Sequence, residues 1–269
     1  MAARPRKLNI PLIKGVAMFL VGGPIAFGAA LSGIGAQVAA APTIDFLLGL
    51  RPERNAGTSL LFALVAAATA VSAAAFAGVG VDGLAALLLA VGATAGVAIT
   101  SGRAAGARAS RWRRLSHAGA GVLGIYVLAE ALRQRVGGPQ SLALEWLRAP
   151  AGLLALGAVC GVVSNVLQVA IGLLFVPALV FLAGTTALSA VITANLVVAL
   201  ASLLPVAGHL VRGTADRHAG LWMVAGGALG GAAGGWLLSR VAADGGAGPL
   251  VWFGLVAMFL GAWQLSRSS

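Results

Sequence analysis

Charged side chains are scarce in this sequence: 7 acidic and 18 basic residues in 269 make up 9% of the chain. A soluble domain carries about a quarter charged residues, so these few cannot cover a water-soluble particle of this size. Hydrophobic residues reach 59%, with a mean hydropathy of +0.97. This composition excludes an ordinary globular enzyme, a disordered chain and a free nucleic-acid-binding protein. It predicts an all-α integral membrane protein that binds no nucleic acid.

Cysteine and histidine are also rare. The one cysteine, Cys160, lies in an apolar stretch, which excludes a disulfide framework and a cysteine-based metal site. His117, His209 and His218 lie near the ends of apolar runs, without carboxylate or cysteine neighbours at ligand spacing. No nucleophile, base or metal-ligand set stands within an apolar segment. The sequence therefore predicts no metal, no cofactor and no enzymatic activity.

The basic residues give a net charge of +11 and lie between apolar runs, as in the Lys- and Arg-rich cytoplasmic loops of membrane proteins. The densest run, 103–114, is predicted to be such a loop and to meet anionic lipid. The basic residues of 4–7, an apolar stretch and the alanines at 39–41 resemble a secretory signal. However, the apolar run from Gly15 is far longer than a signal core, so we interpret it as mature structure.

Sliding the chain against itself by 135 residues aligns its two halves. Between positions 42 and 98, 14 of 57 pairs are identical, about twice what composition alone gives. The sequence predicts two homologous membrane repeats, 1–134 and 135–269. The aligned landmarks are Pro42 with Pro177, Gly49 with Gly184, Thr58 with Thr193, Gly78 with Gly213, Gly92 with Gly227 and Gly96 with Gly231.

Eight apolar segments fill the two halves. A membrane span needs about 20 apolar residues, and six segments fit one helix each. The leading segments do not, because a helix over 15–50 would be roughly 54 Å long against a hydrocarbon core of about 30 Å. Each leading segment must therefore fold back as a hairpin or break within the membrane. The segments are 15–50, 56–77, 83–101, 117–132, 150–184, 186–208, 219–238 and 248–265.

Glycine and proline mark the expected breaks, since glycine permits unwound backbone and proline removes a hydrogen-bond donor. Irregular backbone at membrane depth is tolerated where it is buried in protein or lines a wet cavity. Matched interruptions in two halves point to a transporter's binding site. The predicted helix-break residues are Gly33, Gly35, Pro42, Gly172 and Pro177.

Loop charge bears on the number of crossings. With one crossing per leading segment, the chain has eight transmembrane spans, and Lys and Arg divide 10 to 8 between the two sides. With a two-helix hairpin per leading segment, there are up to ten helical elements and the division becomes 14 to 4. The asymmetry favours hairpins, inverted halves, and both termini on the cytoplasmic side of the inner membrane.

The order of these residues resembles the TauE/SafE family of membrane permeases over nearly the whole chain. The resemblance implies transport of small anions, with sulfite, sulfonates and organosulfur acids as the substrate class. Two departures from the family's pattern are Gln37 and Gln168, amides that stand where its loops carry glycine. The matching stretches are 33–35, Pro42, Gly49 and 56–59 in the first half, and 161–164, Pro177, Gly184, Thr193, 209–216 and 226–236 in the second.

The predicted substrate-binding residues are polar side chains at or after the breaks. Gln37 and Gln168 can each donate two hydrogen bonds to an oxyanion; the alternative is that they only cap loose backbone. Thr58 and Ser59, with Asn55, open the next helix, where N-capping alone would explain them. The full predicted set is Gln37, Thr58, Ser59, Ser164, Gln168, Thr193 and Asn195.

Thr193 and Asn195 lie well inside segment 186–208, which favours a role facing a cavity. No Lys or Arg lies near the centre of a span, so an anion would bind at helix N-termini. Asp45 is a weaker candidate for carrying a coupling proton or cation. Its alternative is an interfacial carboxylate that pairs with Arg51 or Arg54.

Glycines spaced four apart, in 92–96 and in two rows over 226–235, are predicted to let helices pack closely. The sequence thus predicts a permease that moves a small anion by alternating access around the two breaks. The alternatives are a non-transporting scaffold or assembly factor of the same fold and, least favoured, a membrane enzyme. The expected partners are the anion, a coupling ion and membrane lipid. The oligomeric state stays open, with a homodimer as one option.

Overall fold

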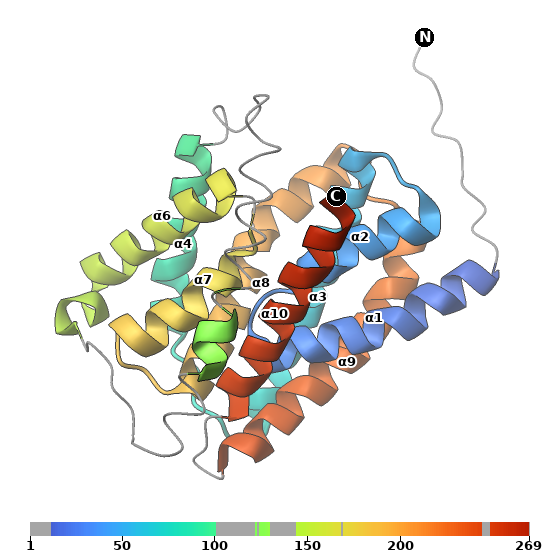
Figure 1. Cartoon of the computed structure of the whole chain (residues 1–269). Coiled ribbons are helices and arrows are strands. Elements are labelled where there is room, and N and C mark those ends of the chain that lie inside the picture. The colour runs from blue at the N-terminus through green and yellow to red at the C-terminus, as the bar shows by residue number, and fades with distance from the viewer. Residues whose placement is uncertain are drawn as a thin grey trace.

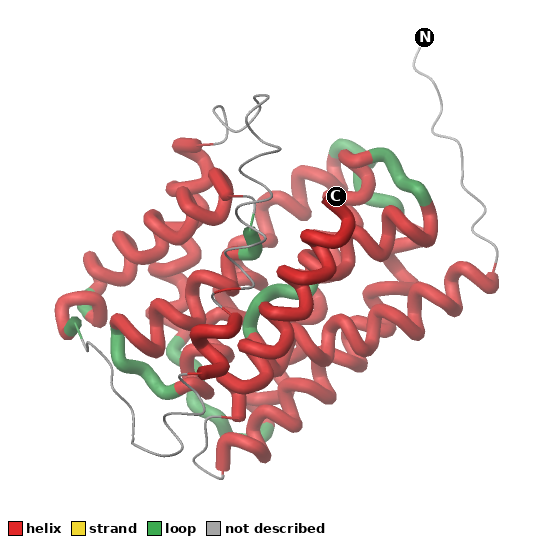
Figure 2. Tube along the Cα trace, viewed as in Figure 1, coloured by secondary structure: helices red, strands yellow, loops and turns green. Residues whose placement is uncertain are grey.

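A computed structural model describes residues 12–100, 122, 124–129, 144–167, 169–243 and 248–268. All regular structure in these ranges is helical (Figure 2). The helices are α1 (Leu12–Ser32), α2 (Gln37–Leu48), α3 (Pro52–Phe76), α4 (Gly83–Thr100), the 3-10 helix η1 (Glu145–Arg148), α6 (Pro150–Leu167), α7 (Ile171–Pro177), the π-helical turn η2 (Ala178–Leu182), α8 (Ala187–Val211), α9 (Arg217–Ala243) and α10 (Gly248–Ser268).

Five of these helices are long and apolar enough to cross a membrane: α1, α3, α4, α8 and most of α9. Shorter apolar helices cover α2, most of α6, Ile171–Leu182 and Gly248–Phe259. The prediction of an all-helical fold is therefore confirmed for the described residues, and these apolar helices are consistent with a membrane protein. The count of eight spans remains a prediction.

Both leading segments break as expected. The first is interrupted between α1 and α2, where Gly33 and Gly35 have φ values of 71° and 99° that favour glycine. The second is interrupted between α6 and α7, and Gly172 is the second residue of the resuming helix. We call residues 33–36 the first tip and residues 169–170 the second tip.

Of the two predicted proline breaks, the one at Pro42 is wrong, and the one at Pro177 is a change of helix type. Pro42 lies inside α2, which continues to Leu48. Pro177 ends α7 but leads directly into the π-helical turn Ala178–Leu182. A proline inside a membrane helix removes one backbone hydrogen bond, a loss that neighbouring groups and local helix adjustments can absorb.

Helix ends gather at two ends of the molecule. The start of α1 meets the start of α9, where a Cβ on Gly15 would lie 2.7 Å from the Trp222 indole nitrogen. The start of α3 meets the end of α8, where a Cβ on Gly57 would lie 3.0 Å from the His209 ring. We call this the basic end, because it carries Lys14, Arg51, Arg54, Arg212 and Arg217 at helix termini and turns.

The opposite end carries fewer basic residues. Arg148 donates hydrogen bonds to the carbonyl oxygens of Ala183 and Gly184, just before α8 begins. Arg240 lies in the last turn of α9 and stacks over Trp236, with 5.2 Å between the guanidinium carbon and the ring centroid. Among the described residues, the basic end thus carries more basic side chains than the opposite end.

Each leading segment folds back on itself (Figure 1). The first hairpin, α1 and α2, leaves from the basic end and returns to it at Arg51. The second hairpin, α6 and α7 with the π-helical turn, leaves from the opposite end at Arg148 and returns to it at Gly184. The hairpins thus enter the helical body from opposite ends.

The two outgoing arms pack in the same way on helices from opposite parts of the chain. A Cβ on Gly226 of α9 would collide with the carbonyl oxygen of Phe19 in α1, and one on Gly92 of α4 with that of Leu154 in α6. Phe19 and Leu154 are 135 positions apart. The contact repeats one turn on, between Gly230 and Gly23 and between Gly96 and Ala158.

In α9 the residue that packs as Gly92 does is Gly226, one position before Gly227, which the predicted repeat aligns with Gly92. The cause is the turn before α9. The stretch from the left-handed Gly213 to Asp216 is one residue shorter than that from the left-handed Gly78 to Asp82. Asp82 accepts a hydrogen bond from a backbone N–H in the first turn of α4, and Asp216 does the same for α9.

Candidate functional site

The two hairpin tips meet in the interior (Figure 2). A Cβ on Gly172, next to the second tip, would collide with the carbonyl oxygen of Gly33 and lie 2.7 Å from that of Ile34. Gly172 and Gly33 are both buried. Backbone therefore contacts backbone here, and the Val176 side chain of α7 lies beside it, 2.9 Å from where a Cβ on Gly33 would be.

Helix α8 supports the first tip. Asn195, only 2% exposed, donates from Nδ2 to the carbonyl oxygen of Ala30 at 3.0 Å. That carbonyl is one of the last four of α1, which have no acceptor role inside their own helix. One turn earlier on α8, the Val191 backbone would lie 3.2 Å from a Cβ on Gly33. Asn195 thus satisfies backbone that the break exposes.

Several backbone donors of the first tip have no described hydrogen-bond partner. Within the described ranges, no acceptor is found for the N–H groups of residues 35–39. Ala36 precedes α2 with helical dihedral angles and makes no side-chain cap. Five successive N–H groups therefore have no hydrogen-bond partner among the residues that the structure describes, and the helix dipole adds partial positive charge at this helix start.

The second tip is closed by its own side chains. Ser164 Oγ donates to the carbonyl oxygen of Val169 at 2.7 Å, and the Val169 N–H donates to the Ser164 carbonyl at 3.1 Å. Asn165 Nδ2 donates to Thr100 Oγ1 at 2.8 Å, which ties the end of α6 to the end of α4. Ser164 is thus at a break, as expected, with its hydroxyl occupied by backbone.

The structure brings Gln37, Ser164 and Asn195 to the tips. Gln37 is the first residue of α2 and is half-buried. Its side chain makes no hydrogen bond to any other residue that the structure describes. Gln168 lies outside the described residues.

Thr58 and Ser59 are placed differently from the prediction. Helix α3 begins six residues earlier, at Pro52, so N-capping is the wrong explanation for them. Thr58 is fully buried; its Oγ1 donates to the Arg54 carbonyl and accepts from the Asp216 N–H at 3.0 Å. Thr58 therefore fastens the α8–α9 turn to α3 at the basic end, and Ser59 donates to the Ala56 carbonyl of its own helix.

Thr193 and Asp45 lie apart from the tips. Thr193 is 5% exposed, but it is two residues from both Val191 and Asn195. About 200° of helix rotation directs its side chain away from the first tip. Asp45 is exposed in the last turn of α2, and it forms no ion pair with Arg51, Arg54 or another described residue.

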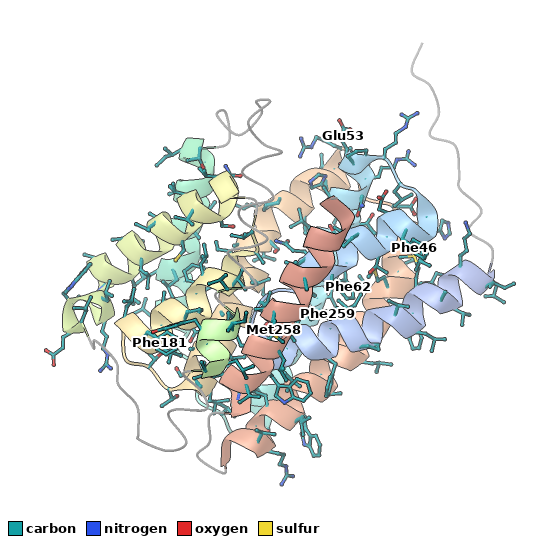
Figure 3. All side chains as sticks on the ribbon, in the orientation of Figure 1. Phe46, Glu53, Phe62, Phe181, Met258 and Phe259 are labelled. Carbon is teal, nitrogen blue, oxygen red and sulfur yellow. The ribbon has the colours of Figure 1, made fainter. Side chains whose placement is uncertain are left out.

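The interior around the tips is apolar. Phe62, fully buried, lies deeper along α3 than Glu53, which stands at the basic end (Figure 3). At the other end, Phe181 makes an edge-to-face contact with Tyr126 at 5.8 Å between ring centroids. The polar groups described at the tips are neutral: backbone N–H and carbonyl groups, amides, and the hydroxyls of Ser32 and Ser164.

Sequence reasoning missed two contacts near this site. One is the approach of Gly172 to Gly33; the glycine at 172 was its only signal. The other is Arg148, whose Nε and Nη2 hold the end of the second hairpin through the Ala183 and Gly184 carbonyls at 2.8 and 2.9 Å. A basic residue just before an apolar segment gives no indication of such a partner.

Comparison with known families gives one match, to the family model described as Sulfite exporter TauE/SafE, over residues 113–263. The match covers more than half of the chain and includes the second hairpin, α8 and α9. Comparison with curated proteins and with solved structures gave no significant match. The family resemblance expected from the residues is thereby confirmed, and the chain belongs to the TauE/SafE sulfite exporter family of membrane transporters.

Proposed function

We propose that this protein carries a small anion, such as sulfite or an organosulfonate, by alternating access around the two hairpin tips. Membership of a family of anion exporter-type membrane transporters carries the proposal. The meeting of two broken helices, held by backbone contact between Gly172 and Gly33, supports it. Such discontinuous helices supply substrate sites in other transporters with repeated halves.

The lengths of the returning arms support a site at membrane depth. Gln37–Leu48 and Ile171–Leu182 each contain 12 residues, which cover at most about 18 Å as helix. That is too short for a hydrocarbon core of about 30 Å. A hairpin that leaves from one end and returns to it over so short an arm has its tip within the core.

The chemistry at the first tip suits an anion. The free N–H groups of residues 35–39 and the helix dipole of α2 supply partial positive charge. The amide of Gln37, and that of Gln168 at the second break, would add donors. Because no formal positive charge is involved, the anion would be held weakly enough to leave on either side.

The distribution of basic residues supports an orientation. The basic end would face the cytoplasm of an inner membrane, as the positive-inside rule requires. Since α1 starts at the basic end, the N-terminus would lie there. α10 starts at the opposite end, where a Cβ on Gly248 would contact Val241 at the end of α9, so the C-terminus would also be cytoplasmic.

The proposal is tested by uptake of labelled sulfite and short sulfonates into proteoliposomes. We expect wild-type protein to transport, and the Gln37→Ala, Gln168→Ala double variant to lose most of the rate while staying folded. Thr43→Ala is the matched control, because Thr43 lies on α2 and the hydrogen bond described for its hydroxyl goes to the Ala39 carbonyl of the same helix. If the double variant still takes up the anion, the two glutamines cap loose backbone and do not bind the substrate. No uptake of any tested anion by wild type, with or without a pH gradient, would favour a non-transporting scaffold.

A further inference from the structure

Helix α8 turns one face toward the first hairpin. Its contacts with the first tip, described above, come from Val191 and Asn195. Val198 continues this face, since its Cγ2 would lie 3.6 Å from a Cβ on Gly35. With about 100° of rotation per residue, these three positions of α8 fall within about 60° of one another. The same face is therefore directed at the first tip over two turns of the helix.

Ser202 is the next residue on this face of α8. It follows Val198 by one turn, and its direction falls between those of Val198 and Asn195. It lies near the middle of α8, which runs from Ala187 to Val211. Ser202 is 5% exposed, so other parts of the protein cover nearly all of its surface.

The start of α2 shares its surroundings with this part of α8. Ala36 and Ala40, at the first turn of α2, belong to the same hydrophobic core as Val198 and Ala199 of α8. From the first tip, α2 and α8 both continue toward the basic end (Figure 1). A residue one turn beyond Val198 is therefore directed at the first turn of α2, where the N–H groups of residues 37–39 have no described acceptor.

The Ser202 hydroxyl has no hydrogen-bond partner among the residues that the structure describes. Hydroxyls inside helices often donate to the carbonyl oxygen four residues earlier, as Thr94 and Thr100 do in α4, but Ser202 does not. Among the described residues, the fully enclosed side-chain atoms without a partner are Asn55 Oδ1 and Thr185 Oγ1. The Ser202 oxygen is not one of them, so it keeps part of the small exposed area of this residue, on a face of α8 that is turned inward.

We propose that Ser202 is a further substrate-binding residue, whose hydroxyl donates a hydrogen bond to the anion held at the start of α2. This inference rests on the proposed function. Buried polar groups are almost always hydrogen-bonded. An oxyanion between α2 and α8 would provide the acceptor that both the Ser202 hydroxyl and the N–H groups of residues 37–39 lack. The anion would then be contacted by two helices, one from each half of the sequence.

Thr193 provides a matched control for Ser202. It also lies on α8 and is also 5% exposed, and its hydroxyl likewise has no described hydrogen-bond partner. The two residues differ in direction, because Thr193 lies about 180° around the helix from Ser202. Thr193 therefore points away from the first tip and from the start of α2. Burial and the lack of a partner are the same in both residues, and only their position relative to α2 differs.

The test measures uptake into proteoliposomes against the concentration of labelled sulfite, or of the short sulfonate that wild type transports fastest. We expect Ser202→Ala to raise the KM about fivefold or more and to keep the maximal rate within about twofold of wild type. Thr193→Ala should change neither quantity by more than about twofold. Because Ser202→Ala removes no hydrogen bond inside the described protein and alanine favours helix, its melting temperature should not fall. An unchanged KM, equal KM changes in both variants, or a melting temperature lowered by several degrees would overturn the inference.

A second readout measures binding without transport. An anion that binds the folded protein raises its melting temperature, which is followed in detergent by tryptophan fluorescence at increasing concentrations of the same anion. We expect Ser202→Ala to need about five times more anion than wild type for the same rise, and Thr193→Ala to match wild type. The same concentration dependence in Ser202→Ala and wild type would overturn the inference. Wild-type protein that neither transports nor is stabilised by sulfite or sulfonates would contradict the proposed function, and the inference with it.

Discussion

Gly33 and Gly172, from opposite halves of the chain, touch through their backbones at the centre of the protein. The Gly33 carbonyl oxygen occupies the place where residue 172 would carry a Cβ, and the Ile34 carbonyl lies 2.7 Å from that position. Gly172 is in regular helix, so its backbone angles do not require glycine. The close approach of the tips requires glycine at this position, because two backbone oxygens cannot move aside as a side chain would.

Gly172→Ala is therefore expected to separate the tips. The added methyl group should cost about 1–3 kcal/mol by overpacking, lower the melting temperature in detergent and abolish uptake. Gly28→Ala is the control, since Gly28 is also helical and a Cβ there meets nothing within 4 Å. A Gly172→Ala protein as stable and active as Gly28→Ala would show that the tips do not need this contact.

Thr58→Val tests whether Thr58 is structural. Valine keeps the shape but loses the oxygen that accepts from the Asp216 N–H and donates to the Arg54 carbonyl. A buried donor left without a partner costs about 1–3 kcal/mol, so the melting temperature should fall by several degrees. Thr58→Ser, which keeps the oxygen, should recover most of the loss, and the KM for the anion should be unchanged in both. A raised KM for the anion with unchanged stability would instead indicate that Thr58 contacts the substrate, as predicted from the sequence.

The sequence was informative where backbone geometry depends on residue type. The break at Gly33 and Gly35 follows from left-handed φ values that disfavour other residues. Pro42 was misleading, because proline costs one hydrogen bond but does not dictate where a membrane helix ends; at Pro177 the α-helix ends and a π-helical turn follows. The N-capping explanation for Thr58 and Ser59 was wrong because α3 starts at Pro52, several residues earlier than expected. Proline is well suited to a first helical position.

Tertiary partners could not be predicted from the sequence. The two glycine rows of α9 indicate that two helices approach closely, and the structure confirms close packing on α1 and α3. Spacing alone does not say which helices these are. The roles of Asn195 and Arg148 depend on carbonyl groups of Ala30 and Gly184, which any sequence offers at every position.

Asn195→Leu tests how far the first tip depends on α8. Leucine is the residue 135 positions earlier, Leu60, which the predicted repeat aligns with Asn195. It removes the 3.0 Å hydrogen bond to the Ala30 carbonyl, and the unpaired carbonyl should cost about 1–3 kcal/mol. We expect a lower melting temperature and a lower maximal uptake rate. As a control, Thr193→Ala alters another buried polar residue of α8, and this change should affect uptake less. An Asn195→Leu protein with wild-type uptake would exclude a role for Asn195 at the tip.

Asp45→Asn addresses ion coupling. A carboxylate that carries a proton or cation through the membrane must reach the path, yet Asp45 is exposed in the last turn of α2, eight residues or about 12 Å of helix from Gln37 at the tip. No described residue pairs with it, so neutralising it should leave stability unchanged. Uptake with and without an imposed pH gradient should also match wild type. Glu53→Gln is the control, an exposed acid in the first turn of α3. If Asp45→Asn alone removed the stimulation by the gradient while downhill uptake persisted, Asp45 would be the coupling residue, and α2 would have to carry its last turn into the path during transport.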